Sequence, residues 1–405
     1  MSFWQIASGL TLAGEIALLA PVGYLAVVAL AASLSSRRST RTASDAQLTR
    51  FAMVIPAHDE QEVIGALLTS LAALDYPRDA YQVFVIADNC TDDTAGVVQQ
   101  SGVAQALVRN DSERRGKGQA LAWAFDLLQR QTPAWDAYIV IDADAIVDPG
   151  VLWAYHRALQ GGAAAVQASN AVLNTLDSPA TALRWLALTL VNHVRPLGRM
   201  RLGANSTLTG NGMCLTRGLL QRQPWRAFGL TEDYQYYLTV TLAGERVVYA
   251  PDANVRSIMP TTFGEMRTQD LRWESLGQGP SNRVWARRLL AVGLRKRDGR
   301  RIEAVAELLA PPLSQLLALV ALATLGALLL GGWPLLTLAG LLIAGTFCYV
   351  GSAFWLLRPP ASAYRALLAA PGFVLWKLWV TLVARRKHSQ TGAWVRTARA
   401  PVARP

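Results

Sequence analysis

The stretch Ala137–Asp144 reads AYIVIDAD and joins a short apolar run to two carboxylates. The aromatic and β-branched run Ala137–Ile141 is typical of a buried strand. Asp142 and Asp144 follow it at spacing i, i+2. Two carboxylates so spaced on a turning backbone can both reach one hard cation, such as Mg²⁺ or Mn²⁺. The alternative is a turn that leads into a helix after Asp148.

The alternation of strands with helices extends on both sides of this stretch. Further strand candidates are Phe51–Pro56, Tyr81–Ala87 and Ala106–Val108, separated by helical patterns over 60–74, 92–100 and 118–128. Strands separated by helices predict a parallel α/β sheet. Because such sheets bind ligands beyond the carboxyl ends of their strands, we expect Glu60, Asp88 and the Asp142 turn to share one rim.

The composition predicts a membrane protein. Of the 405 residues, 52% are hydrophobic and 17% are charged, against roughly 25% charged in soluble domains. Apolar stretches over 16–34, 308–330 and 334–357 are long enough to span a bilayer. No basic residue precedes the first stretch, which favours an uncleaved anchor over a signal peptide. Residues 361–383 contain Pro371 and a central Lys377, which favours an interfacial or re-entrant helix.

The basic residues predict the orientation. The net charge is +11, and arginines flank the apolar stretches after residue 34, before residue 308 and after residue 357. These clusters fall on one side if each stretch spans once, so residues 42–300 are expected in the cytoplasm of a multi-pass inner-membrane protein. No basic-aromatic nucleic-acid motif is present, so the charge favours membrane lipids over nucleic acid. The three cysteines are far apart and predict free thiols.

Three further motifs carry chemistry. Arg114–Gly118 is a basic loop that opens a helix and could hold an anion through Lys117; the alternative is a solvated charge run. Thr231–Asp233 precedes a predicted helix, and a carboxylate fixed there suits a general base, although Thr231 could also cap that helix. In Gln269–Trp273, Arg272 offers bidentate phosphate recognition and Trp273 a flat face for a sugar; the alternative is packing at a membrane surface.

The order of these motifs resembles the family 2 glycosyltransferases. The order is P-A-H-D-E, A-D-N-C-T-D-D-T, R-G-K-G-Q-A-L, D-A-D, T-E-D and Q-D-L-R-W. The resemblance covers roughly residues 50–300 and is strongest to the membrane-bound processive branch, which includes cellulose, chitin, hyaluronan and poly-N-acetylglucosamine synthases. It implies an α/β GT-A fold and a UDP-sugar donor, UDP-GlcNAc or UDP-glucose. The chain departs from the family pattern at Asp59, where Asn is frequent, and at Ala87, where Asp is frequent.

The resemblance also implies roles for individual residues. Asp233 would be the general base that deprotonates the acceptor hydroxyl, and Asp142 and Asp144 would hold UDP and the metal, Mg²⁺ or Mn²⁺. Other nucleotide-sugar contacts would be Glu60, Asp88, Lys117, Arg272, Thr397 and Arg399. Acceptor contacts would be Gly210, Asn211, Glu232, Gln269 and Trp273.

The predicted organisation has five parts: a membrane anchor over 1–41, a cytoplasmic GT-A domain over 42–260, amphipathic interfacial helices over 261–303, a transmembrane hairpin over 304–357, and an interfacial helix with a basic tail over 358–405. The predicted function is inverting, metal-dependent transfer to a growing polysaccharide. The alternatives are transfer of a single sugar to a lipid or lipid-linked acceptor, and a non-catalytic membrane scaffold. A homodimer or an export partner stays open, because three spans are few for a polymer channel.

Overall fold

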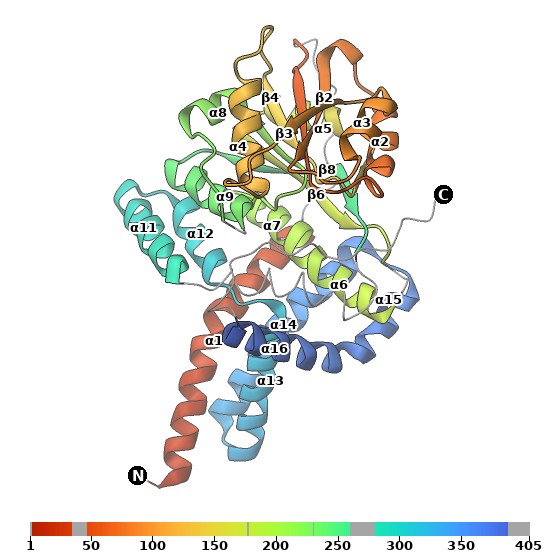
Figure 1. Ribbon diagram of the computed structural model, residues 1–405. Coiled ribbons are helices and arrows are strands. Elements are labelled where there is room, and N and C mark those ends of the chain that lie inside the picture. The colour runs from red at the N-terminus through yellow and green to blue at the C-terminus, as the bar shows by residue number, and fades with distance from the viewer. Residues whose placement is uncertain (1, 35–46, 176–177, 230, 260–279, 388–405) are drawn as a thin grey trace. The chain divides into compact units, whose positions relative to one another are not determined.

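The computed structural model describes residues 2–34, 47–175, 178–229, 231–259 and 280–387. The chain divides into two compact units (Figure 1). Among the described residues, one unit contains 47–174 and 205–259, and the other contains 2–34, 175–204 and 280–387. We call the first the sheet unit and the second the helical unit, and we describe each by itself.

The sheet unit is built on one mixed sheet of eight strands in the order β3-β2-β1-β4-β7-β6-β8-β5. The strands are β1 (Phe51–Ala57), β2 (Tyr81–Asp88), β3 (Gln105–Arg109), β4 (Ala137–Val140), β5 (Ala145–Val147), β6 (Ala165–Val172), β7 (Met213–Thr216) and β8 (Val247–Ser257).

The parallel arrangement predicted from the sequence is confirmed for β1 to β4. β1 pairs in parallel with both β2 and β4, and β2 pairs in parallel with β3. The second half of the sheet differs, because β7 runs antiparallel to both β4 and β6. The sheet as a whole is therefore mixed, and the carboxyl ends of β1, β2 and β4 lie along one edge.

Helices cover both faces of this sheet (Figure 1). One face packs against α2 (Ile64–Ala72), α3 (Thr94–Ser101) and α5 (Val151–Gln160) in a core of aliphatic and some aromatic side chains. The opposite face carries α4 (Lys117–Leu128), α8 (Arg217–Arg222) and α9 (Glu232–Ala243). There the ring of Phe125 contacts those of Tyr138 and Trp225 edge to face. The sheet is thereby enclosed as the middle layer of three.

The first helix of the sheet unit, α2, begins later in the sequence than its hydrophobic pattern predicts. The pattern favours a helix from Glu60, but α2 starts at Ile64. The residues before it form a turn because Asp59 has a φ of 55° and its carboxylate accepts hydrogen bonds from the backbone of Thr91 and Asp92. The Glu60 amide in turn donates to the Thr94 hydroxyl. Side-chain hydrogen bonds therefore delay the helix.

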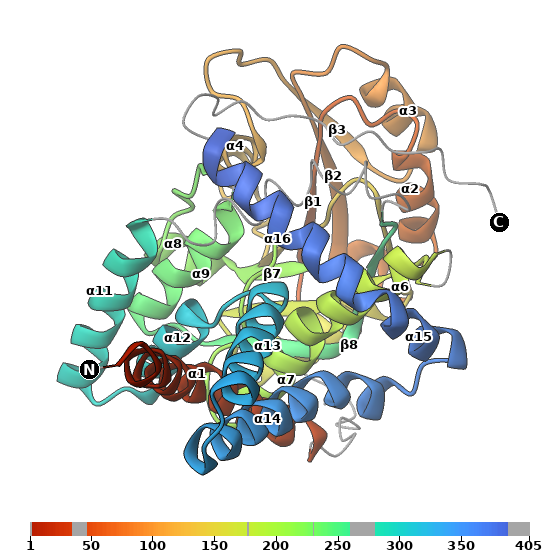
Figure 2. The same cartoon turned by 90° about the horizontal axis from the view of Figure 1, so that it is seen from below.

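The helical unit contains three helices that are long and apolar enough to cross a membrane: α1 (Phe3–Ser33), α13 (Leu313–Leu330) and α14 (Trp333–Leu357). They agree with the three predicted stretches, although α1 begins earlier than expected. They lie side by side (Figure 2), and Gly345 of α14 packs against Val22 of α1.

The remaining segments of the helical unit are less apolar. They are α6 (Pro179–Thr189), the π-helix η2 (Leu190–Val194), α7 (Arg195–Arg201), α11 (Pro280–Lys296), α12 (Gly299–Leu309), α15 (Ala361–Ala366), the 3₁₀-helix η3 (Leu367–Ala369) and α16 (Ala370–Lys387). The segment 361–383, for which an interfacial or re-entrant helix is predicted, is not among the three candidate spans. The segment from α6 to α7 lies inside the predicted 42–260 domain but belongs to the helical unit.

A buried ionic network joins four helices of this unit. Arg199 is fully buried and donates two hydrogen bonds to Glu303, of 2.6 and 2.9 Å. Arg195 donates to Glu307 at 3.2 Å and to the Tyr349 hydroxyl at 2.7 Å. The Tyr24 hydroxyl lies 2.6 Å from Glu303. Two arginines on α7 and two glutamates on α12 therefore balance each other's charge, and they link α7 and α12 to α1 and α14.

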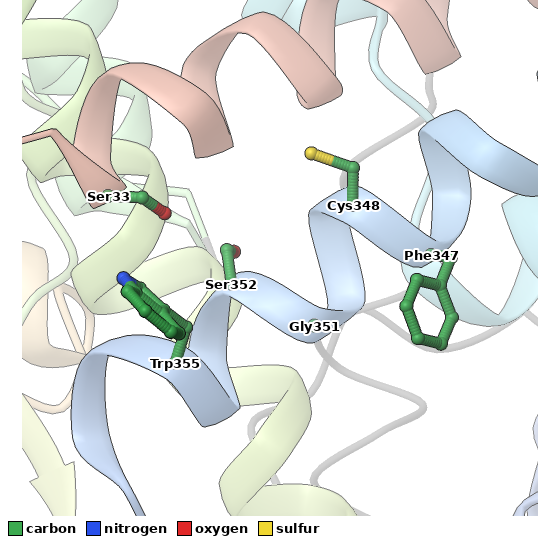
Figure 3. A pocket seen from close by; sticks show the side chains of 6 residues that line it. All are labelled: Ser33, Phe347, Cys348, Gly351, Ser352 and Trp355. Carbon is green, nitrogen blue, oxygen red and sulfur yellow. The ribbon is translucent and has the colours of Figure 1, made fainter.

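The helical unit has a hollow on the surface of α14. Figure 3 shows Trp355 and Phe347 on α14, on either side of Gly351, with Ser33 of α1 on the side of Trp355. Phe347 is 78% exposed and Trp355 is 65% exposed. None of its lining residues is a predicted site residue, so this hollow is separate from the candidate active site.

Candidate active site

Four segments of the sheet unit meet at Lys117, the first residue of α4. Its ammonium group lies 2.6 Å from Asp142 Oδ1, 3.1 Å from the Gly210 carbonyl oxygen and 3.9 Å from Glu232 Oε1. Asp142 follows β4, and Glu232 opens α9. The structure thus brings together predicted site residues that are far apart in the sequence.

Asp233 belongs to the same cluster through its contact with Gly210. Gly210 has a φ of +77°, a conformation that favours glycine. A methyl group at Gly210 would stand 2.8 Å from Asp233 Oδ2 and 3.4 Å from Lys117 Nζ. The loop backbone can therefore lie directly against both charged groups because residue 210 has no side chain. The other Asp233 oxygen, Oδ1, accepts a hydrogen bond from the Tyr234 amide at 2.8 Å.

The charges of this cluster shift one another's pKa values. Burial raises the pKa of Glu232 and that of Asp233, and the nearby Lys117 opposes both shifts without cancelling them. Burial lowers the pKa of Lys117, but Asp142 and Glu232 outweigh it and raise that pKa above its ordinary value. Lys117 is therefore charged at neutral pH, and the two acids of α9 bind protons more readily than ordinary carboxyl groups.

The turn after β4 presents Asp142 and Asp144 on one side. Both are partly exposed, whereas Ala143 between them is buried. Asn211 holds the turn, because its side-chain oxygen accepts from the Asp142 amide and its NH₂ group donates to the Ser257 hydroxyl. Asn211, predicted to contact the acceptor, is only 2% exposed. The structure thus places it beneath the turn as a support.

Gln167 of β6 is a supporting residue that the sequence analysis missed. Its side-chain NH₂ group donates to the Asn211 carbonyl oxygen at 2.7 Å, and its side-chain oxygen accepts from the Thr209 amide at 2.9 Å. It is 1% exposed. The one available signal was a glutamine within the apolar run of a strand, since a buried amide needs partners.

Asp88 and Glu60 lie at the carboxyl ends of β2 and β1, as predicted. Asp88 is 6% exposed and pairs with Arg109 of β3. Glu60 is partly exposed, in the turn that follows β1. Because β1, β2 and β4 are parallel, both residues lie on the same edge of the sheet as the Asp142 turn.

Asp59, Cys90 and Asp92 also bring carboxylate and thiol atoms close together. Turn hydrogen bonds explain this group. Asp59 accepts from Thr91 and from the Asp92 amide, and Asp92 accepts from Thr94 and Gln61. We therefore do not assign a metal to it.

Thr231 stands at the N-cap position of α9, but its side chain makes no capping hydrogen bond. The alternative interpretation of T-E-D as a side-chain cap is therefore wrong for Thr231. Five predicted contacts lie outside the described residues, so the structure does not place them: Gln269, Arg272, Trp273, Thr397 and Arg399.

A mixed sheet with a lysine and several acids at its carboxyl edge agrees with the GT-A fold that the sequence motifs predict. The fold is similar to that of a mannosyltransferase from Pyrobaculum calidifontis, solved in complex with GDP-mannose and Mn²⁺. The TM-score is 0.57 at 19% sequence identity, covering 92% of this chain and 99% of that one. The GT-A fold predicted from the sequence is thereby confirmed.

The family described as "Glycosyltransferase like family 2" matches residues 49–275, which is more than half of the chain. The chain therefore belongs to glycosyltransferase family 2, as its motifs predict.

Three curated relatives are similar over part of their length. A probable glycosyltransferase, YdaM, of Bacillus subtilis is 23% identical over 56% of this chain and 55% of its own. A beta-monoglucosyldiacylglycerol synthase of Synechocystis is 27% identical over 59% of this chain and 50% of its own. A poly-beta-1,6-N-acetyl-D-glucosamine synthase of Staphylococcus aureus is 22% identical over 57% of this chain and 55% of its own. The chain thus spans about half the length of these relatives.

Proposed function

We propose that this protein transfers a sugar from a UDP-sugar to an acceptor hydroxyl at the cytoplasmic face of a membrane, with inversion at the anomeric carbon. The observation that carries the proposal is the cluster in which Lys117, Asp142, Glu232 and Asp233 meet at the Gly210 loop. Family membership and the three apolar helices support it.

The donor set at the Asp142 turn fits a divalent cation. The Lys117 ammonium group donates a hydrogen bond to Asp142 Oδ1. The carboxylate oxygens of Asp142 and Asp144 are hard ligands of the kind that Mg²⁺ and Mn²⁺ prefer. Three carboxylates lie around one ammonium group, so the cluster has an excess of negative charge. We propose that Asp142 and Asp144 hold the cation, which would neutralise charge on the departing diphosphate.

In this proposal Asp233 takes the proton from the acceptor hydroxyl. The acceptor oxygen then bonds to the anomeric carbon as the bond from that carbon to the UDP oxygen breaks, and UDP leaves with both electrons of that bond. Burial suits Asp233 for this task, because a carboxylate with a raised pKa is a stronger base. Lys117 would orient Asp142 and hold a phosphate oxygen.

The acceptor has two candidates. We propose a growing polysaccharide, which the Q-D-L-R-W motif favours. Transfer of one sugar to a lipid is the second candidate, and similarity to a beta-monoglucosyldiacylglycerol synthase favours it. Both candidates place the acceptor at the membrane, which agrees with three helices apolar enough to span it.

The test is UDP release by the full chain, purified in detergent, with UDP-GlcNAc and UDP-glucose in parallel. Each donor is tried with Mg²⁺, with Mn²⁺ and with EDTA. We expect release with one donor, dependence on metal and loss in Asp233→Asn. The length of the labelled product separates a polymer from a single-sugar lipid. If the Asp233→Asn variant released UDP as fast as the unaltered chain, the result would contradict the proposal and favour a non-catalytic membrane scaffold.

A further inference from the structure

The helix α11 carries a positive charge that the described part of the chain does not balance. It contains five basic residues and no acidic one: Arg283, Arg287, Arg288, Arg295 and Lys296. All five side chains are exposed. None of them forms an ion pair with any residue that the structure describes. The side of α11 that carries them is therefore a dense positive surface.

Large apolar side chains lie between these basic residues on the exposed side of α11. Val284 is 48% exposed, Leu290 is 40% exposed and Leu294 is 61% exposed. On the opposite side α11 packs against α12, since a methyl group at Gly293 would stand 2.9 Å from Ile302 Cγ1. The exposed side of a helix in water is normally polar. A side that mixes arginines with large apolar groups instead suits the boundary between water and a hydrocarbon phase.

The fold holds α11 close to helices that are apolar enough to cross a membrane. Its packing partner α12 ends at Leu309, and only three residues separate α12 from α13. The Tyr24 hydroxyl of α1 lies 2.6 Å from Glu303 and 3.0 Å from Glu307 of α12. Figure 2 shows α11 beside α12 at the margin of the helical unit. These contacts and the short link therefore place the α11–α12 pair at the end of the apolar helices where α13 begins.

A bilayer surface that contains anionic phospholipids matches both properties of this side. We infer that α11 docks on anionic phospholipids, with its guanidinium groups on lipid phosphates and its exposed valine and leucines among the first acyl carbons. Negatively charged lipids attract a basic segment that lies beside a membrane span. A second copy of this chain is a poor partner, because two such positive faces would repel each other. The inference goes beyond the proposed function, since it concerns the surrounding lipid and not the sugar.

The test measures backbone hydrogen exchange of α11 by mass spectrometry, with the full chain in lipid nanodiscs and no sugar donor. One set of nanodiscs contains phosphatidylcholine alone, and in the other a third of it is replaced by phosphatidylglycerol. The test variant combines Arg287→Gln with Arg288→Gln. The matched control combines Arg130→Gln with Arg246→Gln, which removes the same charge from two exposed arginines of the sheet unit. Exchange of β1 checks that each variant is folded.

We expect phosphatidylglycerol to slow the exchange of α11 in the unaltered chain and in the control. Salt at about 1 M should reverse this effect, because charges are then screened beyond about 3 Å. The protection gained should be about 30-fold smaller in the test variant, as for two charges of about 1 kcal/mol each. Equal exchange in the two lipids would overturn the inference, and so would protection that a folded test variant retains in full. Heparin that protects α11 equally well in neutral nanodiscs would also overturn it, because the partner would then be a soluble polyanion.

Discussion

Replacement of Asp233 by asparagine tests the centre of the proposed mechanism. Asparagine has the same shape, and its oxygen can still accept the Tyr234 amide hydrogen bond of 2.8 Å. The backbone of Gly210 lies close to the other oxygen, Oδ2. A positioned general base contributes about 10²–10⁴-fold, which corresponds to about 3–5 kcal/mol of activation free energy. We expect kcat to fall by that factor.

The same change should leave the protein as stable as before or slightly more stable. Asp233 is buried beside Glu232 and Asp142, so loss of its charge relieves repulsion. Thermal unfolding in detergent, measured beside UDP release, separates a lost base from a lost fold.

Glu232→Gln is the matched control, since this acid is one residue away and contacts the same lysine at 3.9 Å. As a predicted acceptor contact, it should change the KM for the acceptor more than kcat. The opposite ranking, with kcat retained in Asp233→Asn and lost in Glu232→Gln, would refute the assignment of the base.

Three further predictions concern the Gly210 loop, the titration of Asp233 and the buried ionic network of the helical unit. Gly210→Ala should lower kcat at least tenfold in the UDP-release assay, because a methyl group there meets Asp233 Oδ2 at 2.8 Å and the φ is +77°. Activity should be present above the pKa of Asp233 and lost as the pH falls through that pKa. Ordinary carboxyl groups titrate at about pH 4, and the pKa of Asp233 is raised by burial, so kcat/KM should begin to fall at a higher pH than that. A fall in kcat/KM only at about pH 4 or below would contradict the assignment of Asp233 as the base. Glu303→Gln should destabilise the helical unit by about 3 kcal/mol, because it removes the counter-charge of the buried Arg199; thermal unfolding would show it, and an unchanged midpoint would exclude a stabilising network.

The first half of the sheet could be predicted because its signals are local. FAMVIP is an uninterrupted apolar run, and YQVFVIA is interrupted only by Gln82. Both become parallel strands that are buried on both faces apart from Gln82. A helix follows each of them, and a right-handed crossover then places their carboxyl ends on one edge. The nearness of Asp142 to Lys117 agrees with that topology, but it was the resemblance to the family that assigned these residues, 25 positions apart, to one site.

The second half could not be predicted, because its strands lack such runs. β6 reads AVQASNAV, with a buried glutamine whose partners lie about 40 residues further along the chain. β7 is only four residues long. A buried polar side chain looks like a break in a strand pattern until its partners are known, and those partners belong to the Gly210 loop. The supporting residues of the site were therefore hidden in the sequence.

The ionic network of the helical unit was hidden for a related reason. Arg195 and Arg199 are spaced i, i+4, as are Glu303 and Glu307, and each pair alone is typical of a solvated helix face. The Arg199–Glu303 contact joins residues 104 positions apart. Only the fold shows that the arginine pair and the glutamate pair contact each other in the interior of the helical unit.

Lys117 connects the charge balance of the site with its chemistry. One ammonium group faces the carboxylates of Asp142, Glu232 and Asp233, so the site must gain protons or cations to be stable. Protonation of these carboxylates would remove the excess negative charge, but it would also neutralise Asp233, the proposed base. A divalent cation on Asp142 and Asp144 would instead leave Asp233 ionised, and it would also offset the two negative charges that a nucleotide diphosphate brings. The excess of carboxylates is thus a physical reason for the metal and the donor to bind together.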